Sequence, residues 1–239
     1  MKQLVKAAAR SFGYEVQRAD TPLAALISDP SRSHMAYALV KVFRSLEGLR
    51  FLQIGANDGR RNDPICHLID RFGWSGVFVE PDPVMMARLQ VHRPGPRFTH
   101  VPFAVARQTG RLTFYSLEGK GLPEFANGLG TLSRERIEAA ARHLEKFDPR
   151  IVERAIDCLS VPDLLAKVGK SFDVLVIDVE GLDYDILQLL AESHALAKIV
   201  HYEHKCLSEE DRQGSFALLM QTGYNLLITE EDCTAYRRC

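Results

Sequence analysis

The sequence predicts an α/β domain in which a mostly parallel β-sheet is covered by helices on both faces. From residue 50 onward, short apolar runs alternate with stretches of helical periodicity, and short turns join them. The run Phe172–Ile177 is apolar almost throughout, which is typical of a central strand that is buried on both sides. A strand–helix–strand rhythm of this kind builds a parallel sheet.

Residues 1–48 are predicted to form a helical segment ahead of this domain. Residues 2–12 have the pattern of a short amphipathic helix, which Gly13 stops. Residues 33–47 repeat apolar side chains at spacings of three and four, and Gly48 ends that helix. We expect these helices either to form a contact in a homo-oligomer or to cover the substrate pocket.

The predicted domain spans residues 49–239. Its first half contains three predicted strands and two predicted helices. The strands are Arg50–Ile54, Gly76–Glu80 and Arg97–Phe103. Between them lie the predicted helices Pro64–Phe72 and Pro83–His92.

The rhythm breaks in the middle of the chain. Arg111–Ser116 alternates like an exposed strand, and four glycines follow within residues 117–132. A charged helix is predicted at about Ser133–Phe147, and a strand at Ile151–Leu159. An irregular, glycine-rich stretch inside a regular fold is typical of a substrate cover. We therefore expect a lid insertion at about residues 116–150.

Regularity returns at Ser160, which we expect to cap a helix that runs to Val168. The remaining predicted elements are the strand Phe172–Ile177, the helix Asp183–Glu192, the strand Lys198–Glu203, a helix capped by Ser208 that runs to Gln221, and the strands Tyr224–Thr229 and Thr234–Arg237.

Composition excludes several classes of partner. The net charge is -1, and no cationic block suggests a nucleic acid or an anionic membrane. No apolar run approaches the roughly 18 residues that a membrane span requires. The five cysteines are widely spaced and lack a CxxC pair, so they indicate neither a zinc site nor a disulfide framework. Lys6 and Arg10 interrupt the candidate core of a signal peptide. We expect reduced thiols and a cytoplasmic location.

The stretch Phe51–Gly59 (FLQIGANDG) is a strand that runs into a glycine turn. Gly55 and Gly59 permit a tight turn and the close approach of a ligand to the backbone. Glu80 follows 21 residues after Gly59, at the end of the next strand, where a carboxylate can accept both hydroxyls of a ribose. The glycine turn and the Glu80 carboxylate together predict a nucleoside ligand.

Two nucleoside classes compete for this turn. A dinucleotide fingerprint requires G-x-G-x-x-G, but Asn57 and Arg60 occupy the second and third glycine positions. S-adenosylmethionine needs a looser turn because it has no pyrophosphate. In that case Asp58 could bind the ammonium of the ligand's amino-acid part.

Several stretches resemble the FkbM-type S-adenosylmethionine-dependent methyltransferases. They are FLQIGANDGRRNDPI (51–65), WSGVFVEPDP (74–83), VPFAVA (101–106), GTLSRERI (130–137) and VLVIDVEGLDYDIL (174–187). The resemblance implies a Rossmann-like class I methyltransferase with a seven-stranded sheet, whose last hairpin supplies a reversed strand. It also implies methyl transfer to oxygen, commonly a hydroxyl of a glycan or natural product. One departure is Val176, where many relatives have lysine.

The resemblance assigns S-adenosylmethionine to the ends of four strands. Its methionine part would be lined by the turn at Gln53, Gly55, Asn57, Asp58 and Gly59, and Glu80 would hold its ribose. Pro81, Phe103 and Ala104 would border the adenine. Asp178 would lie beside the reactive methyl group.

Methyl transfer to a hydroxyl also calls for a general base or a metal ion. Asp178, Glu203 and His204 are the candidate catalytic residues, with Glu180 and His201 as further candidates nearby. Side chains alternate along a strand, so His201 and Glu203 share one face while Tyr202 and His204 take the other, although this parity relaxes near a strand end. His204 has an alternative role as a structural histidine. Asp178 and Glu203 are the pair that a divalent metal would use, although no compact metal-ligand motif supports one.

We therefore predict an S-adenosylmethionine-dependent O-methyltransferase that acts on a hydroxyl of a sugar, glycan or related natural product. One alternative is an NAD-linked oxidoreductase on a similar sheet, against which the failed dinucleotide fingerprint argues. The other is a non-catalytic module that binds S-adenosylmethionine.

Overall fold

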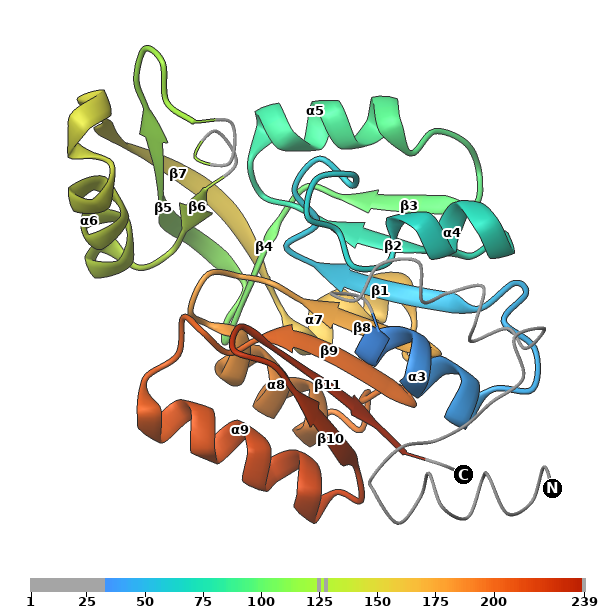
Figure 1. Ribbon diagram of the computed structural model, residues 1–239. Coiled ribbons are helices and arrows are strands. Elements are labelled where there is room, and N and C mark those ends of the chain that lie inside the picture. The colour runs from blue at the N-terminus through green and yellow to red at the C-terminus, as the bar shows by residue number, and fades with distance from the viewer. Residues whose placement is uncertain (1–32, 124–125, 127–128, 238–239) are drawn as a thin grey trace, which may run out of the picture.

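The computed structural model describes residues 33–123, 126 and 129–237. Its centre is a seven-stranded sheet with the spatial order β10-β11-β9-β8-β1-β2-β3 (Figure 1). From β9 to β3 all neighbours are parallel, whereas β11 is antiparallel to both β9 and β10. The predicted sheet is confirmed, including the reversed strand in the last hairpin. Its strands are β1 (Arg50–Ile54), β2 (Ser75–Val79), β3 (Phe98–Val101), β8 (Val174–Ile177), β9 (Ile199–Glu203), β10 (Asn225–Ile228) and β11 (Asp232–Tyr236).

Helices cover both faces of this sheet, as predicted. On one face lie α3 (Ser33–Val42), α4 (Cys66–Phe72) and α5 (Pro83–His92), and on the other α7 (Val161–Val168), α8 (Asp183–Glu192) and α9 (Glu209–Gln221). Because consecutive side chains of a strand point to opposite faces, each strand feeds two cores. In β1, Phe51 packs with the helices of the first face, and Leu52 packs with those of the second.

Local sequence signals set the ends of several helices. Asp82 caps α5 by accepting hydrogen bonds from the backbone N–H groups of Val84 and Met85. The predicted caps at Ser160 and Ser208 are confirmed, since each side chain accepts from the N–H three residues on. The helix predicted for residues 33–47 is shorter than expected, because α3 ends at Val42.

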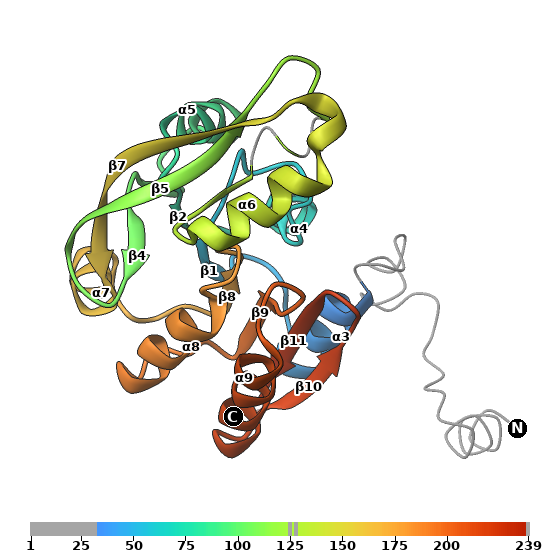
Figure 2. The same ribbon diagram turned by 90° about the vertical axis from the view of Figure 1, so that its left-hand side faces the viewer.

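A second, four-stranded sheet has the order β4-β7-β5-β6. Figure 2 shows β5, β7 and α6 as a unit that projects beyond the main sheet. Ile137 of α6 packs with Leu117 of β5 and Leu144, which gives this unit its own small core. Its elements are β4 (Ala104–Ala106), β5 (Gly110–Glu118), β6 (Gly130–Thr131), α6 (Arg134–His143), a 3-10 turn at Glu145–Phe147 and β7 (Arg150–Ser160).

The sequence predicted strands near β5 and β7, but it missed β4. The strand predicted as Arg97–Phe103 is wrong at its end, because β3 stops at Val101 and β4 begins at Ala104 in the other sheet. Pro102 has no N–H to continue the ladder, so the chain leaves the main sheet there.

The N-terminal segment is described only from residue 33. The helix predicted for residues 2–12 therefore lies outside the described residues. Among residues 33–123, 126 and 129–237, no helix combines the length and the apolar character that crossing a membrane would take.

Candidate functional site

Two adjoining cavities open at the carboxyl ends of the parallel strands. The narrow slot, about 80 Å³, lies over the ends of β1 and β2 and beside β4, and the wide cavity, about 750 Å³, lies over β1, β8, β9 and β11. Gly55, Asn57, Asp178 and Glu180 line both cavities and form the border between them. The border lies between β1 and β8, where the strand order reverses, and this is where open α/β sheets bind ligands.

Gly55 brings the loops that follow β1 and β8 into direct contact. Its φ of +81° lies in the left-handed region, and its N–H donates to the carbonyl of Val79 at 2.9 Å. A Cβ atom at this position would lie only 1.7 Å from the backbone oxygen of Asp178. Glycine is therefore required here both for its conformation and for the packing of the two loops.

Glu80 braces the same turn from the end of β2. Its Oε2 accepts the N–H of Asn57 at 2.7 Å, and its Oε1 accepts the N–H of Asp82 at 2.8 Å. Burial raises the pKa of Glu80 to about 7, although the two N–H donors oppose the shift. Each carboxylate oxygen has a second lone pair, so Glu80 can still accept hydrogen bonds from ligand hydroxyls.

The other walls of the slot are mainly apolar. A flat aromatic ring suits such walls, and a carboxylate at one end suits a pair of hydroxyls, so these residues fit a nucleoside. Apolar residues lining the slot include Val79, Pro81, Phe103, Ala104, Val105, Phe114 and Leu132.

Two rows of side chains on one face of the sheet form the floor of the wide cavity. The strand register aligns one residue each of β1, β8, β9 and β11 across the sheet, and these four residues form the deeper row. The outer row lies two positions further along, toward the carboxyl ends of the parallel strands, where side chains point to the same face again. The deeper row consists of Gln53, Val176, His201 and Thr234, and the outer row consists of Gly55, Asp178, Glu203 and Asp232.

Carboxylates dominate the outer row. The side chain of Asp178 is exposed to the cavities, and protein surrounds it on its other sides. Burial, together with Asp183, Glu180 and Glu203, raises its pKa well above the usual value. Burial also raises the pKa of Glu203, and its Oε2 has no hydrogen-bond partner among the described residues.

Asp183 holds the loop after β8 in place. It is fully buried, and its two carboxylate oxygens accept the N–H groups of Val179 at 3.2 Å and Gly181 at 3.1 Å. Burial raises its pKa to about 7. These two hydrogen bonds fix a loop in which Glu180 has a φ of +55°.

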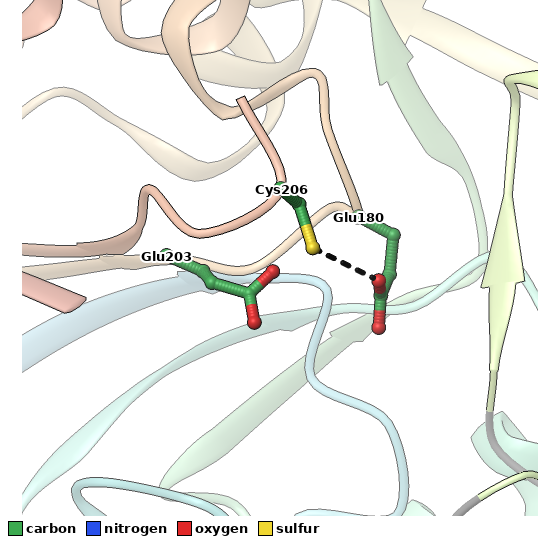
Figure 3. A group of neighbouring side chains, drawn as sticks. All are labelled: Glu180, Glu203 and Cys206. Carbon is green, nitrogen blue, oxygen red and sulfur yellow. Dashed lines mark hydrogen bonds between the residues drawn. The ribbon is translucent and has the colours of Figure 1, made fainter. Parts of the chain in front are cut away.

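Glu180, Glu203 and Cys206 point toward one another at the rim of the cavity (Figure 3). Their ligand atoms lie within 4.8 Å of one another, and the Cys206 thiol donates to Oε2 of Glu180 at 3.8 Å. Burial raises the pKa of the Cys206 thiol, and the neighbouring carboxylates of Glu203 and Glu180 raise it further. Asp178, which the sequence offered with Glu203 as the pair that a divalent metal would use, is outside this group, and we assign no metal here.

The second sheet and its helix reach the cavity border through Glu180. The guanidinium of Arg136, on α6, lies 3.5 Å from Oε2 of Glu180. The hydroxyl of Thr131, on β6, donates to the backbone carbonyl of Glu180 at 3.1 Å. Sequence reasoning singled out neither residue, because nothing local connects them to Glu180, which lies more than 40 residues away.

Most of the residues predicted to bind the cofactor line one of the two cavities, but Asp58 and Gly59 line neither. Oδ1 of Asp58 accepts the N–H groups of Arg60 and Arg61, and these bonds lower its pKa although burial opposes them. A Cβ on Gly59 would lie 2.4 Å from Cδ1 of Leu89, so this glycine lets the turn pack against α5.

The structure does not bring His204 to either cavity. It is 3% exposed, and its Nε2 lies 3.1 Å from the carbonyl of Thr229. Its ring packs edge-on against Phe216 of α9, on the opposite face of the sheet from the cavity floor. The strand alternation therefore continues through His204, whereas we had expected it to relax there.

The start of α3 contributes to the wide cavity. His34 and Met35 line it, and α3 packs over β9 and β11 on the same face as the cavity floor. Of our two expectations for the N-terminal helices, the cover is the one that these contacts support for α3.

Comparisons with known proteins identify a family. A family model described as the methyltransferase FkbM domain matches residues 53–223. No curated protein sequence matches the chain. Solved structures similar to this chain include methyltransferase FkbM from Methylobacillus flagellatus KT, with 12% identity, a TM-score of 0.47, and coverage of 90% of this chain and 56% of that one.

Two further similar structures are methyltransferases or bind their cofactor. Precorrin-6y C5,15-methyltransferase from Geobacter metallireducens GS-15 has 11% identity and a TM-score of 0.43, with coverage of 89% of this chain and 90% of that one. Aeropyrum pernix fibrillarin, in complex with natively bound S-adenosyl-L-methionine, has 12% identity and a TM-score of 0.39, with coverage of 84% and 73%.

Proposed function

The chain belongs to the FkbM methyltransferase family, and we propose that it transfers the methyl group of S-adenosylmethionine to a hydroxyl of a sugar, glycan or related natural product. The family match over residues 53–223 carries the methyltransferase activity and argues against the NAD-linked alternative. The hydroxyl acceptor is our inference from the two adjoining cavities.

The slot suits the adenosine half of the cofactor. Phe103 and Ala104 offer apolar walls to the adenine, and Pro81 extends them. Glu80 keeps lone pairs for the ribose hydroxyls while it braces the turn. When bound, S-adenosylmethionine supplies an electrophilic methyl group on a sulfonium.

The border and the deeper row suit the methionine half. Gly55 and Asn57 line both cavities, so a ligand that extends from one to the other passes them. Gln53 is 3% exposed, and its Oε1 is buried without a hydrogen-bond partner among the described residues. An orphaned acceptor of this kind is costly unless a ligand donor such as an ammonium satisfies it. Asp58, whose carboxylate is bound to the turn itself, is a weaker candidate.

The wide cavity suits a polyhydroxylated acceptor. The carboxylates of Asp178, Glu203 and Asp232 accept hydrogen bonds from hydroxyl groups, which hold such an acceptor in one orientation. Orientation of the attacking oxygen supplies much of the rate in a displacement of this type. The observation that carries the proposal is the position of Asp178 on the border between the slot and this cavity.

The test is turnover with isotopically labelled S-adenosylmethionine and a panel of p-nitrophenyl glycosides, followed by NMR of the product. We expect a new O-methyl signal on a pyranose ring. Methylation only of nitrogen or carbon acceptors would refute the hydroxyl proposal. Binding of S-adenosylhomocysteine without any turnover would instead favour the non-catalytic module.

We also propose a cytoplasmic location. Four cysteines of the described residues are free, which suits a reducing compartment. Localisation of a tagged chain by cell fractionation tests this, and recovery from an oxidising compartment would contradict it.

A further inference from the structure

We propose that His201 is the general base that takes the proton of the acceptor hydroxyl. This assignment rests on the proposed O-methyl transfer, which requires a base beside the attacking oxygen. Of the two histidines that the sequence offers as candidate bases, it selects His201 on β9 over His204, which directly follows β9.

His201 stands on the floor of the wide cavity. It belongs to the deeper row, on the same face of β9 as Glu203, and its side chain lines the cavity. Its Nδ1 lies 2.9 Å from Oγ1 of Thr234, which is directly opposite on β11. When Nδ1–H donates to that hydroxyl, the lone pair of the neutral ring is on Nε2.

Nε2 of His201 is available to a ligand. Within the part of the chain that the structure describes, only Nδ1 of this ring has a hydrogen-bond partner. Nε2 is not among the buried atoms that lack a partner, whereas Nδ1 of His204 is. Because the ring lines the cavity, the accessible nitrogen is the one that faces it.

His204 offers the matched contrast. Its ring is on the opposite face of β9, at 3% exposure, and Nε2 is occupied by the carbonyl of Thr229. Two histidines at the end of one strand thus differ in the feature that a base requires, which is a lone pair that the acceptor can reach.

Charged groups from several elements line the same cavity as His201. Asp178 follows β8, Glu203 lies on β9 itself, Asp232 comes from β11, and His34 comes from α3. Burial lowers the pKa of His201, and His34 adds to this effect, while Asp232 opposes it. A lowered pKa favours the neutral ring that a base requires before reaction, and the Asp232 carboxylate favours the imidazolium that forms when the ring accepts a proton.

The step balances in charge and atoms. Nε2 takes the hydroxyl proton as the acceptor oxygen bonds to the methyl carbon, and the sulfur–methyl bond breaks with its electron pair left on sulfur. One positive charge moves from the sulfonium to the imidazole inside the same carboxylate-lined cavity. His201 then releases its proton to water.

The test compares His201→Asn with His204→Asn. Asparagine at 201 keeps a group that can reach Thr234 but supplies no base, so we expect kcat to fall at least about 100-fold. Affinity for S-adenosylhomocysteine, measured by calorimetry, should stay unchanged. His204→Asn should keep kcat within about threefold at temperatures below its melting point. Added imidazole should restore turnover in His201→Gly, which separates a lost base from a distorted site.

A second measurement needs no turnover. Diethyl pyrocarbonate reacts with accessible, neutral imidazole nitrogens, and mass spectrometry locates the product. In the native protein we expect modification of His201 and protection of His204. The reverse pattern, or protection of both, would overturn the assignment.

The outcomes also separate this inference from the proposed function. If the wild type methylates a glycoside hydroxyl and His201→Asn retains more than about a third of its kcat, then His201 is not the base and the proposed function stands. If the wild type methylates only nitrogen or carbon acceptors, both proposals fail.

Discussion

The slot and the wide cavity share a border but are built in different ways. The turn beside the slot is fixed by hydrogen bonds between the ends of two consecutive strands, since Glu80 accepts the N–H of Asn57 and Gly55 donates to the carbonyl of Val79. The wide cavity depends on side chains that strand register aligns from residues 53 to 234. The turn on the cofactor side thus depends on consecutive strands, whereas the floor on the acceptor side combines strands that are far apart in the sequence.

This difference implies separate consequences for mutation. A change in the slot disturbs the turn itself, so it affects both folding and cofactor binding. A change on the cavity floor removes one side chain from a rigid sheet, so it affects the acceptor or the chemistry.

The largest effect is expected from Gly55→Ala. The new Cβ would meet the backbone oxygen of Asp178, and its φ of +81° strains any other residue. Strain and overpacking together should lower the free energy of unfolding by about 3 kcal/mol or more. Denaturant titration measures this change. Gly110→Ala is the control, because nothing lies within 4 Å of its Cβ; equal losses in both variants would contradict the account.

Asp178→Asn should come next, with an effect on turnover. Asp178 lies on the border, where its carboxyl group can orient the acceptor hydroxyl beside the reactive methyl group. We expect kcat to fall about 1,000-fold while affinity for S-adenosylhomocysteine changes little. The exposed Asp157, which pairs with Arg111, gives the control Asp157→Asn. Wild-type turnover in Asp178→Asn would refute a role at the chemistry.

Asp183→Asn should change how stability depends on pH. Burial raises the pKa of Asp183 from 3.8 to about 7, so the folded state binds more protons than the unfolded state between these values. The free energy of unfolding therefore falls as pH rises through this window. Between about pH 5 and about pH 7 the free energy of unfolding of the wild type should fall by about 2 kcal/mol more than that of the variant.

Asp58→Asn provides a control of opposite sign. The pKa of Asp58 is lowered, so its contribution is present at neutral pH and is lost as pH falls below its usual pKa of 3.8. Denaturation curves at several pH values measure both variants. If the free energies of unfolding of Asp183→Asn and the wild type differ by the same amount at every pH, the raised pKa of Asp183 is contradicted.

The smallest effect on stability is expected from Arg136→Gln. Its ion pair with Glu180 is about one-third exposed on both sides, and such pairs contribute less than about 1 kcal/mol. Because Arg136 also lines the wide cavity, the KM for the acceptor should rise about threefold while affinity for the cofactor holds. The matched control is Arg134→Gln, which removes the exposed ion pair with Glu138 and should leave the KM for the acceptor unchanged.

The same contrast explains what the sequence could predict. The turn Gly55–Gly59, Glu80 and the strand–helix order depend on local patterns, so the sheet and the part of the slot at the ends of β1 and β2 were predictable. The contact of Gly59 with Leu89 was not, because it depends on where α5 packs. For the same reason, β4 was missed, since its three residues pair with a strand about 50 positions away.

The acceptor side shows the limit more clearly. Side-chain alternation correctly placed His201 and Glu203 on the opposite face from His204. The structure was needed to show which face is buried, because His204 packs against Phe216 and contacts the carbonyl of Thr229. Arg136 and Thr131 reach Glu180 from a unit whose position no local signal contains. The residues of the acceptor side are brought together by the pairing of distant strands, which cannot be deduced from a single sequence.

The most direct test of the central contrast is one pair of variants, Glu80→Gln and Glu203→Gln, each measured for S-adenosylhomocysteine affinity and for acceptor KM and kcat. Glu80→Gln should raise the Kd for S-adenosylhomocysteine about 10- to 100-fold, because one N–H of the turn loses its charged acceptor. Glu203→Gln should leave that Kd within about twofold and change only the acceptor parameters. If Glu203→Gln weakens S-adenosylhomocysteine as much as Glu80→Gln does, the division into a cofactor side and an acceptor side is wrong.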